Sequence, residues 1–162
     1  MAMSNPAWRR AIFAGILGTL VFSVLLHLAP MVGSPRINVP LWDGTLVTLN
    51  LRAAMIVGYV LEFGIGVLLA RLYQALGPRP KASPIGRGAL YGLLLWGVLM
   101  LIGLPLFGLL SPLVSHGLML GPGLFAWHYG VSTTLLFMVS LLMYGISVGY
   151  LTDAPLLRQI AR

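Results

Sequence analysis

The chain has 162 residues, of which 59% are hydrophobic and only 8% are charged, whereas about 25% of the residues in an average soluble domain are charged. Ten Lys and Arg residues against three Asp and Glu residues give a formal net charge of +7. So few charged side chains cannot cover a globule in water, and the composition therefore excludes an ordinary soluble enzyme. The absence of cysteine also excludes disulfides and thiolate metal sites.

Four apolar stretches are long enough to cross a bilayer as helices, which takes about 20 residues each. They predict an all-α bundle of four transmembrane helices that forms one integral membrane domain. The predicted spans are residues 11–30, 53–76, 88–110 and 125–151. Pro105 lies inside the third span and predicts a kink there, because proline removes a backbone donor.

Lys and Arg residues predict the orientation of the spans, because cytoplasmic loops carry an excess of them. When the chain is threaded up-down-up-down, eight of them fall on one side: Arg9, Arg10, Arg71, Arg79, Lys81, Arg87, Arg158 and Arg162. Arg36 and Arg52 fall on the other side. We therefore expect both termini in the cytoplasm, with anionic lipids around the basic residues on that side. Nucleic acid is not an expected partner, because no basic face with interleaved aromatic residues occurs.

The two halves of the chain resemble each other. Residues 14–35 and 91–112 have the same length, both have Gly in second position, and both end in Ser-Pro. The stretch from Glu62 to Val67 parallels the stretch from Met143 to Val148. We therefore predict a parallel duplication of a two-helix unit, related by an axis along the membrane normal.

Small residues recur four positions apart along the predicted helices, a spacing that lets helix backbones approach closely in a membrane. The pairs are Ala11/Gly15, Ala14/Gly18, Ala54/Gly58, Gly66/Ala70, Gly88/Gly92 and Gly145/Gly149. This pattern favours a compact bundle with a surface left for a partner.

Glu62 is the sharpest chemical signal, because it falls near the bilayer midplane, where a charge costs at least about 2.5–3.5 kcal/mol. Arg71 is about 13 Å away along the helix axis, too far for a direct ion pair. Six further residues either lie at a similar predicted depth to Glu62 or share a semi-polar helix face with it or opposite it: Tyr59, Thr19, Ser23, Trp96, Ser140 and Tyr144. Two interpretations stay open: a neutral carboxyl that ties helices together, or a carboxyl that binds a proton or a ligand.

Three histidines, His27, His116 and His128, are predicted on the outer side. An imidazole can ligate a metal, a haem or a chlorophyll-type pigment. It can equally form hydrogen bonds at the membrane interface, and no two of these histidines are three or four residues apart. The sequence therefore requires no cofactor, and a haem or pigment site on these residues is an alternative.

Sequence signals for an enzyme are poor. The three acids are predicted in different layers, Asp43 outside, Glu62 in the centre and Asp153 inside, which excludes a two-carboxylate catalytic site. Neither an HExxH motif nor a glycine loop for phosphate occurs. We therefore expect that the protein is not an enzyme.

Several short motifs carry a family resemblance. They are Ala29-Pro30-Met31-Val32-Gly33, Gly58-Tyr59, Phe63-Gly64-Ile65-Gly66, Arg87-Gly88-Ala89-Leu90-Tyr91-Gly92-Leu93 followed by Trp96, and Pro105-Leu106-Phe107-Gly108. On these motifs the chain resembles a group of small, uncharacterised bacterial inner-membrane proteins with four spans and unknown function. Members of that group tend to carry His at the position of Glu62. The resemblance implies the four-span architecture and a location in the bacterial inner (plasma) membrane, and it implies no activity.

The functional hypothesis from the sequence is a non-enzymatic membrane protein that acts by helix packing. Its partners would be other membrane subunits, for which it serves as an accessory subunit, or further copies of itself. The first alternative is a small proton-coupled transporter with Glu62 at its centre, which would need a dimer because four spans are few. The second alternative is a membrane subunit that binds haem or pigment through one of the three histidines.

Overall fold

The computed structural model describes residues 6–77 and 83–153, and this part of the chain is helical without a strand. Four helical stretches are long and apolar enough to cross a membrane. They are α1 (Pro6–His27), α3 (Leu51–Ala75), the stretch Pro84–Leu110, and α7 (Val131–Asp153). The predicted all-α fold with four membrane helices is therefore confirmed.

Two helix boundaries differ from the predicted spans. α1 ends at His27, because Pro30 lacks the backbone N–H that a continuing α-helix would need. A short 3-10 helix, η2 (Ala29–Val32), follows and contains Pro30 in its first turn. α7 begins at Val131 instead of residue 125, because residues Leu124–Tyr129 form a separate 3-10 segment, η4. Within η4, Phe125 and Ala126 have φ angles of 52° and 53°, a left-handed conformation that an α-helix cannot contain.

The third membrane helix is interrupted where Pro105 predicts a kink. α4 (Pro84–Val98) passes into a π-helical turn at Leu99–Gly103, and α5 (Leu104–Leu110) follows. A π-turn next to proline accommodates the missing backbone donor without ending the helix. A four-residue helix, α6 (Pro112–Ser115), completes this side.

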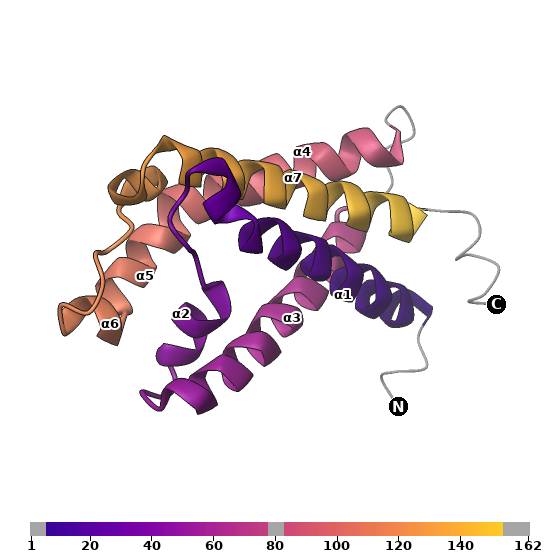
Figure 1. Ribbon diagram of the computed structural model, residues 1–162. Helices are drawn as coiled ribbons and strands as arrows, with labels where there is room; N and C mark the ends of the chain where they lie inside the picture. The colour runs from indigo at the N-terminus through magenta and orange to yellow at the C-terminus, as the bar shows by residue number, and fades with distance from the viewer. Residues whose placement is uncertain (1–5, 78–82, 154–162) are drawn as a thin grey trace.

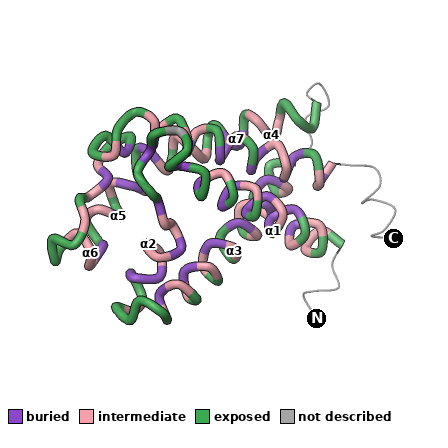
Figure 2. The backbone as a smooth tube through the Cα atoms, viewed as in Figure 1, coloured by how far each residue is buried: buried purple, intermediate pink, exposed green. Residues whose placement is uncertain are grey.

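The four long helices pack in the order α3, α1, α7, α4. α3 and α4 stand at the two ends of this row and do not pack extensively against each other. Figure 1 shows the result: α1 begins and α7 ends at one end of the bundle, here called the terminal end, and α3 diverges from α4 and α5 away from it. The buried backbone in Figure 2 follows the faces that the helices turn toward one another.

Glycines make the closest helix contacts. A Cβ atom on Gly15 of α1 would lie 2.8 Å from Val67 N and 2.9 Å from Gly66 O of α3. A Cβ on Gly145 of α7 would likewise meet the backbone of Gly92 of α4, 2.8 Å from its Cα atom. Such contacts need glycine, because any side chain would push the two backbones apart.

All six predicted small-residue pairs lie in contacts within this chain. α1 packs on α3 through Gly15 and Gly66, and α4 packs on α7 through its glycines. The pair Ala54/Gly58 faces a short helix instead of another span, α2 (Val39–Thr45), whose Pro40 backbone touches Gly58. The pairs therefore explain the compact bundle and do not by themselves indicate a partner.

The predicted duplication matches the packing in part. Gly15 and Gly92, which the repeat places in equivalent positions, both contact the following long helix of their own half. In the second helices the equivalence fails, because Gly64 has open space where a Cβ would be added, whereas its counterpart Gly145 is tightly packed against α4.

A polar cluster joins α3, α4 and α7 at the terminal end. Arg87 and Asp153 form an ion pair of 3.0 Å, and the Tyr73 hydroxyl donates to Asp153 at 3.3 Å. The Tyr91 hydroxyl donates to the Leu69 carbonyl at 2.8 Å, and the Tyr73 and Tyr91 rings meet edge to face. This terminal clasp, made of Arg87, Asp153, Tyr73 and Tyr91, joins α3 and α4 at the terminal end.

Basic residues gather at the terminal end in the part of the chain that is described. Arg71 lies over the ring of Trp8, 5.8 Å from its centroid, and Arg87 belongs to the terminal clasp. The predicted basic residues Arg79, Lys81, Arg158 and Arg162 lie outside the described residues.

Candidate functional site: a cleft between α3 and α4

The divergence of α3 from α4 leaves a cleft of about 430 Å³. Its walls come from every long helix, from α2, and from α5, and they are mostly aliphatic and aromatic. Ile65 of α3, Val98 of α4 and Leu106 of α5 line the cleft and are each about half exposed, at 48%, 56% and 48%. The cleft therefore reaches the apolar surface of the bundle between α3 and the α4–α5 side, where acyl chains would lie in a membrane.

Glu62 lines this cleft from α3 and is 6% exposed. Its Oε1 accepts a hydrogen bond from the Ser23 hydroxyl of α1. Its Oε2 is fully buried and has no hydrogen-bond partner among the described residues. A buried carboxyl oxygen without a partner is costly, so Glu62 has an unused hydrogen-bonding capacity inside the protein.

Three of the six predicted neighbours are brought to the site. Ser23 bonds Glu62 directly, as depth matching predicted. Thr19 of α1 and Tyr144 of α7 line the same cleft. The Tyr144 hydroxyl donates to the Gly66 carbonyl at 2.5 Å, so that it fixes α7 against α3 one turn from Glu62.

The other three predicted neighbours are not among the residues that line the cleft. The Trp96 indole donates to the Thr134 carbonyl at 3.2 Å, on the side of α4 that packs on α7. Ser140 is completely buried, and its hydroxyl has no partner in the described part of the chain. Tyr59 precedes Glu62 by almost one turn and is only half buried.

The position of Asp43 is one that the sequence did not reveal. Asp43 lines the same cleft as Glu62, although the sequence predicted the two acids in different layers. The reason is α2, which follows α1 and η2 and folds back along α3, with Pro40 on Gly58 and Gly44 on Ala54. Burial, and next the nearby charge of Glu62, raise the pKa of Asp43 from 3.8 to about 6.

A local signal for α2 is present in the sequence. Asn38 precedes the helix, and its side-chain oxygen accepts from Leu41 N at 3.0 Å, while Pro40 stands in the first turn. Asn before a turn that contains Pro is typical of a helix start. The signal predicts a helix here and does not predict that it lies along α3.

Each of the three histidines pairs with a backbone carbonyl of its own segment. His27 Nδ1 lies 2.9 Å from Ser23 O, His116 Nδ1 lies 2.7 Å from Pro112 O, and His128 Nδ1 lies 2.5 Å from Gly121 O. Within residues 6–77 and 83–153, no group of three His, Asp or Glu residues could hold a metal ion. A metal site built from these three histidines is therefore not formed in the described chain.

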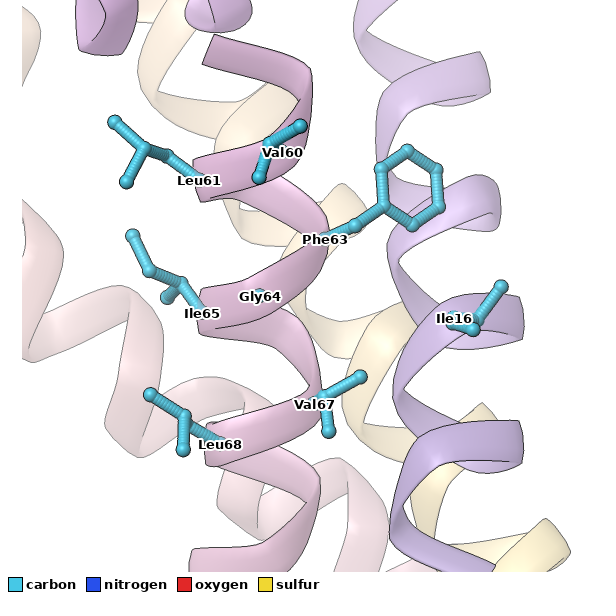
Figure 3. A pocket seen from close by; sticks show the side chains of 8 residues that line it. All are labelled: Ile16, Val60, Leu61, Phe63, Gly64, Ile65, Val67 and Leu68. Carbon is cyan, nitrogen blue, oxygen red and sulfur yellow. The ribbon is translucent and has the colours of Figure 1, made fainter. Parts of the chain in front are cut away.

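A second hollow lies on the outer face of α3 beside α1 (Figure 3). It surrounds Gly64, and the side chains drawn around it are all carbon, including Ile16 of α1 and Phe63, Val67 and Leu68 of α3. It offers no polar group to a ligand, so the cleft with its two carboxyls is the better candidate for a functional site.

Fold and cleft together define the class: a helical membrane protein with four membrane helices and a buried carboxyl in a cleft open toward the lipid. Comparison with protein-family models, curated proteins and solved structures gives no match.

Proposed function

We propose that the protein is a small proton-coupled carrier that accepts a largely apolar ligand from the bilayer into the α3–α4 cleft, with Glu62 as the polar group of the site. The observation that carries the proposal is the buried Glu62 Oε2, which lacks a hydrogen-bond partner in the described chain and lies in an apolar cleft. Ligand pockets of about 300–1,000 Å³ with a few polar groups are typical of small-molecule sites, and the cleft volume of about 430 Å³ falls in this range.

The carrier would lie in the bacterial inner membrane with its terminal end in the cytoplasm. The excess of Lys and Arg predicted at that end supports this orientation. The terminal clasp would then close the cytoplasmic side of the cleft, because it joins α3 and α4 at that end. A second copy of the chain would complete a transport path, since four helices are few for a carrier.

Labelling of Glu62 with a hydrophobic carbodiimide tests the proposal, because this reagent partitions into lipid and reacts with protonated carboxyls. The protein in liposomes is treated with dicyclohexylcarbodiimide, and the modified residue is located by peptide mass spectrometry. We expect an adduct on Glu62 that the Glu62→Gln variant lacks. Asp153 should remain unmodified, because it is paired with Arg87 in the terminal clasp and does not line the cleft.

Two matched variants test whether the cleft is the route to Glu62. Val98 and Ile102 are both exposed on the same helical stretch, at 56% and 60%, but only Val98 lines the cleft. Val98→Trp should slow the labelling severalfold by filling the opening, while Ile102→Trp should leave the rate unchanged. An unlabelled Glu62, or equal rates for the two variants, would contradict the proposal.

A role by helix packing is the second candidate, and one observation favours it. The hollow around Gly64 is apolar, exposed and bounded by α1 and α3, a shape that suits a helix of another subunit or a second copy. Gly64→Leu should then lower the oligomeric state measured by light scattering in mild detergent. A wild-type protein that is monomeric in the same detergent would count against this candidate.

A further inference from the structure

We infer that the ligand of the cleft is a lipophilic monocation, an apolar body that carries one positive charge and is held between Asp43 and Glu62. The inference rests on the proposed function and names the chemical class that the same site would accept. The observation behind it is the arrangement of charge in the cleft: α2 and α3 each bring one carboxyl to it, and the described residues that line it include no Lys, Arg or His.

The two carboxyls lack a compensating charge within the cleft. Glu62 receives one hydrogen bond, from the neutral Ser23 hydroxyl. His27 is the nearby basic group that interacts electrostatically with Glu62, but it is exposed and its Nδ1 pairs with the Ser23 carbonyl at 2.9 Å. A cation in the cleft would supply the missing opposite charge, and in surroundings of low polarity that attraction is strong.

The walls suit a bulky and poorly hydrated cation. Phe22 of α1, Phe107 of α5, Phe137 of α7 and Trp42 of α2 all line the cleft. The Trp42 ring stacks on the Phe107 ring with centroids 5.3 Å apart, and the centroid of the Tyr129 ring lies 5.7 Å from that of Trp42. Aromatic faces attract cations, most strongly when water is excluded.

Other ligand classes fit less well. An anion would face two carboxyls, and a fully apolar molecule would leave Glu62 Oε2 without a partner. A Ca²⁺ ion takes six to eight oxygen ligands, and Mg²⁺ demands near-octahedral coordination, whereas the cleft offers two carboxyls among apolar walls. A single positive charge on an apolar body uses both the acids and the aromatic rings.

Binding of such a cation must compete with protons. The groups that face Glu62 are Ser23 and His27 from α1, Asp43 from α2 and Tyr144 from α7, while α4 brings aliphatic residues to the cleft. A carboxyl that is protonated in the empty cleft must release its proton before it can pair with a cation. Occupancy and proton release are then linked, which is what a proton-coupled carrier requires.

The test uses three tetraphenyl compounds of nearly the same shape and different charge. Binding of tetraphenylphosphonium, tetraphenylmethane and tetraphenylborate to the purified full-length protein is measured by equilibrium dialysis in mild detergent. We expect the phosphonium to bind more tightly than the other two compounds, and its affinity to fall by up to about tenfold per pH unit as the pH is lowered.

Three variants locate the binding site. Glu62→Gln should weaken phosphonium binding by about tenfold or more, since it removes the charge but keeps an acceptor for Ser23 so that the fold is retained. Asp43→Asn should weaken binding as well. Arg36→Gln changes an exposed charge that does not line the cleft and should leave the affinity unchanged. Circular dichroism and gel filtration check the fold of each variant.

The outcomes separate this inference from the proposed function. If the borate or the neutral compound binds as tightly as the phosphonium, or if none of the three binds, the ligand class is wrong. The carrier proposal then still stands as long as Val98→Trp protects Glu62 from the carbodiimide. If that protection is also absent, the carrier proposal and the inference both fail.

Discussion

The contact between α4 and α7 predicts a large difference between two glycines of the same helix. A Cβ atom on Gly92 would lie 2.8 Å from Leu142 Cα and closer still to the Leu141 carbonyl oxygen. Because ordinary contacts begin at 3.4 Å and the added Cβ would lie about 1 Å closer than that to Leu141 O, the two backbones would have to separate by about 1 Å. Gly97, about one and a half turns further along α4, has nothing within 4 Å of an added Cβ.

We therefore expect Gly92→Ala to lower the free energy of unfolding by about 1–3 kcal/mol, the usual cost of overpacking. Gly97→Ala should leave it unchanged or raise it by up to about 1 kcal/mol, because alanine favours a helix more than glycine does. Unfolding in mixed micelles with increasing sodium dodecyl sulfate, followed by circular dichroism, measures both values. If the two variants agree to within about 0.5 kcal/mol, the described packing of α4 on α7 is wrong.

Two further predictions concern the charged residues. Burial and the nearby charge of Glu62 raise the pKa of Asp43 from 3.8 to about 6. Between these pH values the folded chain keeps a proton on Asp43 that the unfolded chain releases. The stability that Asp43 contributes is therefore full below about pH 4 and is lost as the pH rises through 6. Unfolding measured from pH 4 to pH 7 should show this decline, and Asp43→Asn should flatten it; an equally steep decline in the variant would refute the assignment. Arg87→Met should lower the free energy of unfolding by about 2 kcal/mol, because it leaves Asp153 without its ion pair and Gly77 O without a donor. The exposed Arg36 offers the control, and Arg36→Met should cost less than about 0.5 kcal/mol.

The four membrane helices could be predicted because each one is a long apolar run, and the bilayer fixes the length that a helix needs. The contact of Ser23 with Glu62 was also predictable, since two helices that begin near opposite faces place residues of similar depth side by side. Trp96 has a suitable depth as well, but it lies where α4 packs on α7, and its indole donates to the Thr134 carbonyl of α7. Depth along a helix follows from sequence, whereas the rotation and the neighbour of a helix do not.

The position of Asp43 in the cleft could not be predicted from the sequence pattern. Its segment is short and contains Pro40, Asp43 and Gly44, which indicate a loop or turn. The segment instead forms α2 and packs along α3, because Gly58 and Gly44 let the two backbones touch. That contact is between residues of two different elements, and neither the hydropathy nor the spacing of either element reveals it.

Counting protons tests most directly whether occupancy of the cleft is coupled to the proton on Glu62. Tetraphenylphosphonium is added to weakly buffered protein near the midpoint of its pH-dependent binding, and the pH change is recorded with a dye. We predict release of up to about one proton per cation bound by the wild-type protein and clearly less from Glu62→Gln at matched occupancy. Cation binding without proton release, or equal release from the variant, would contradict the account.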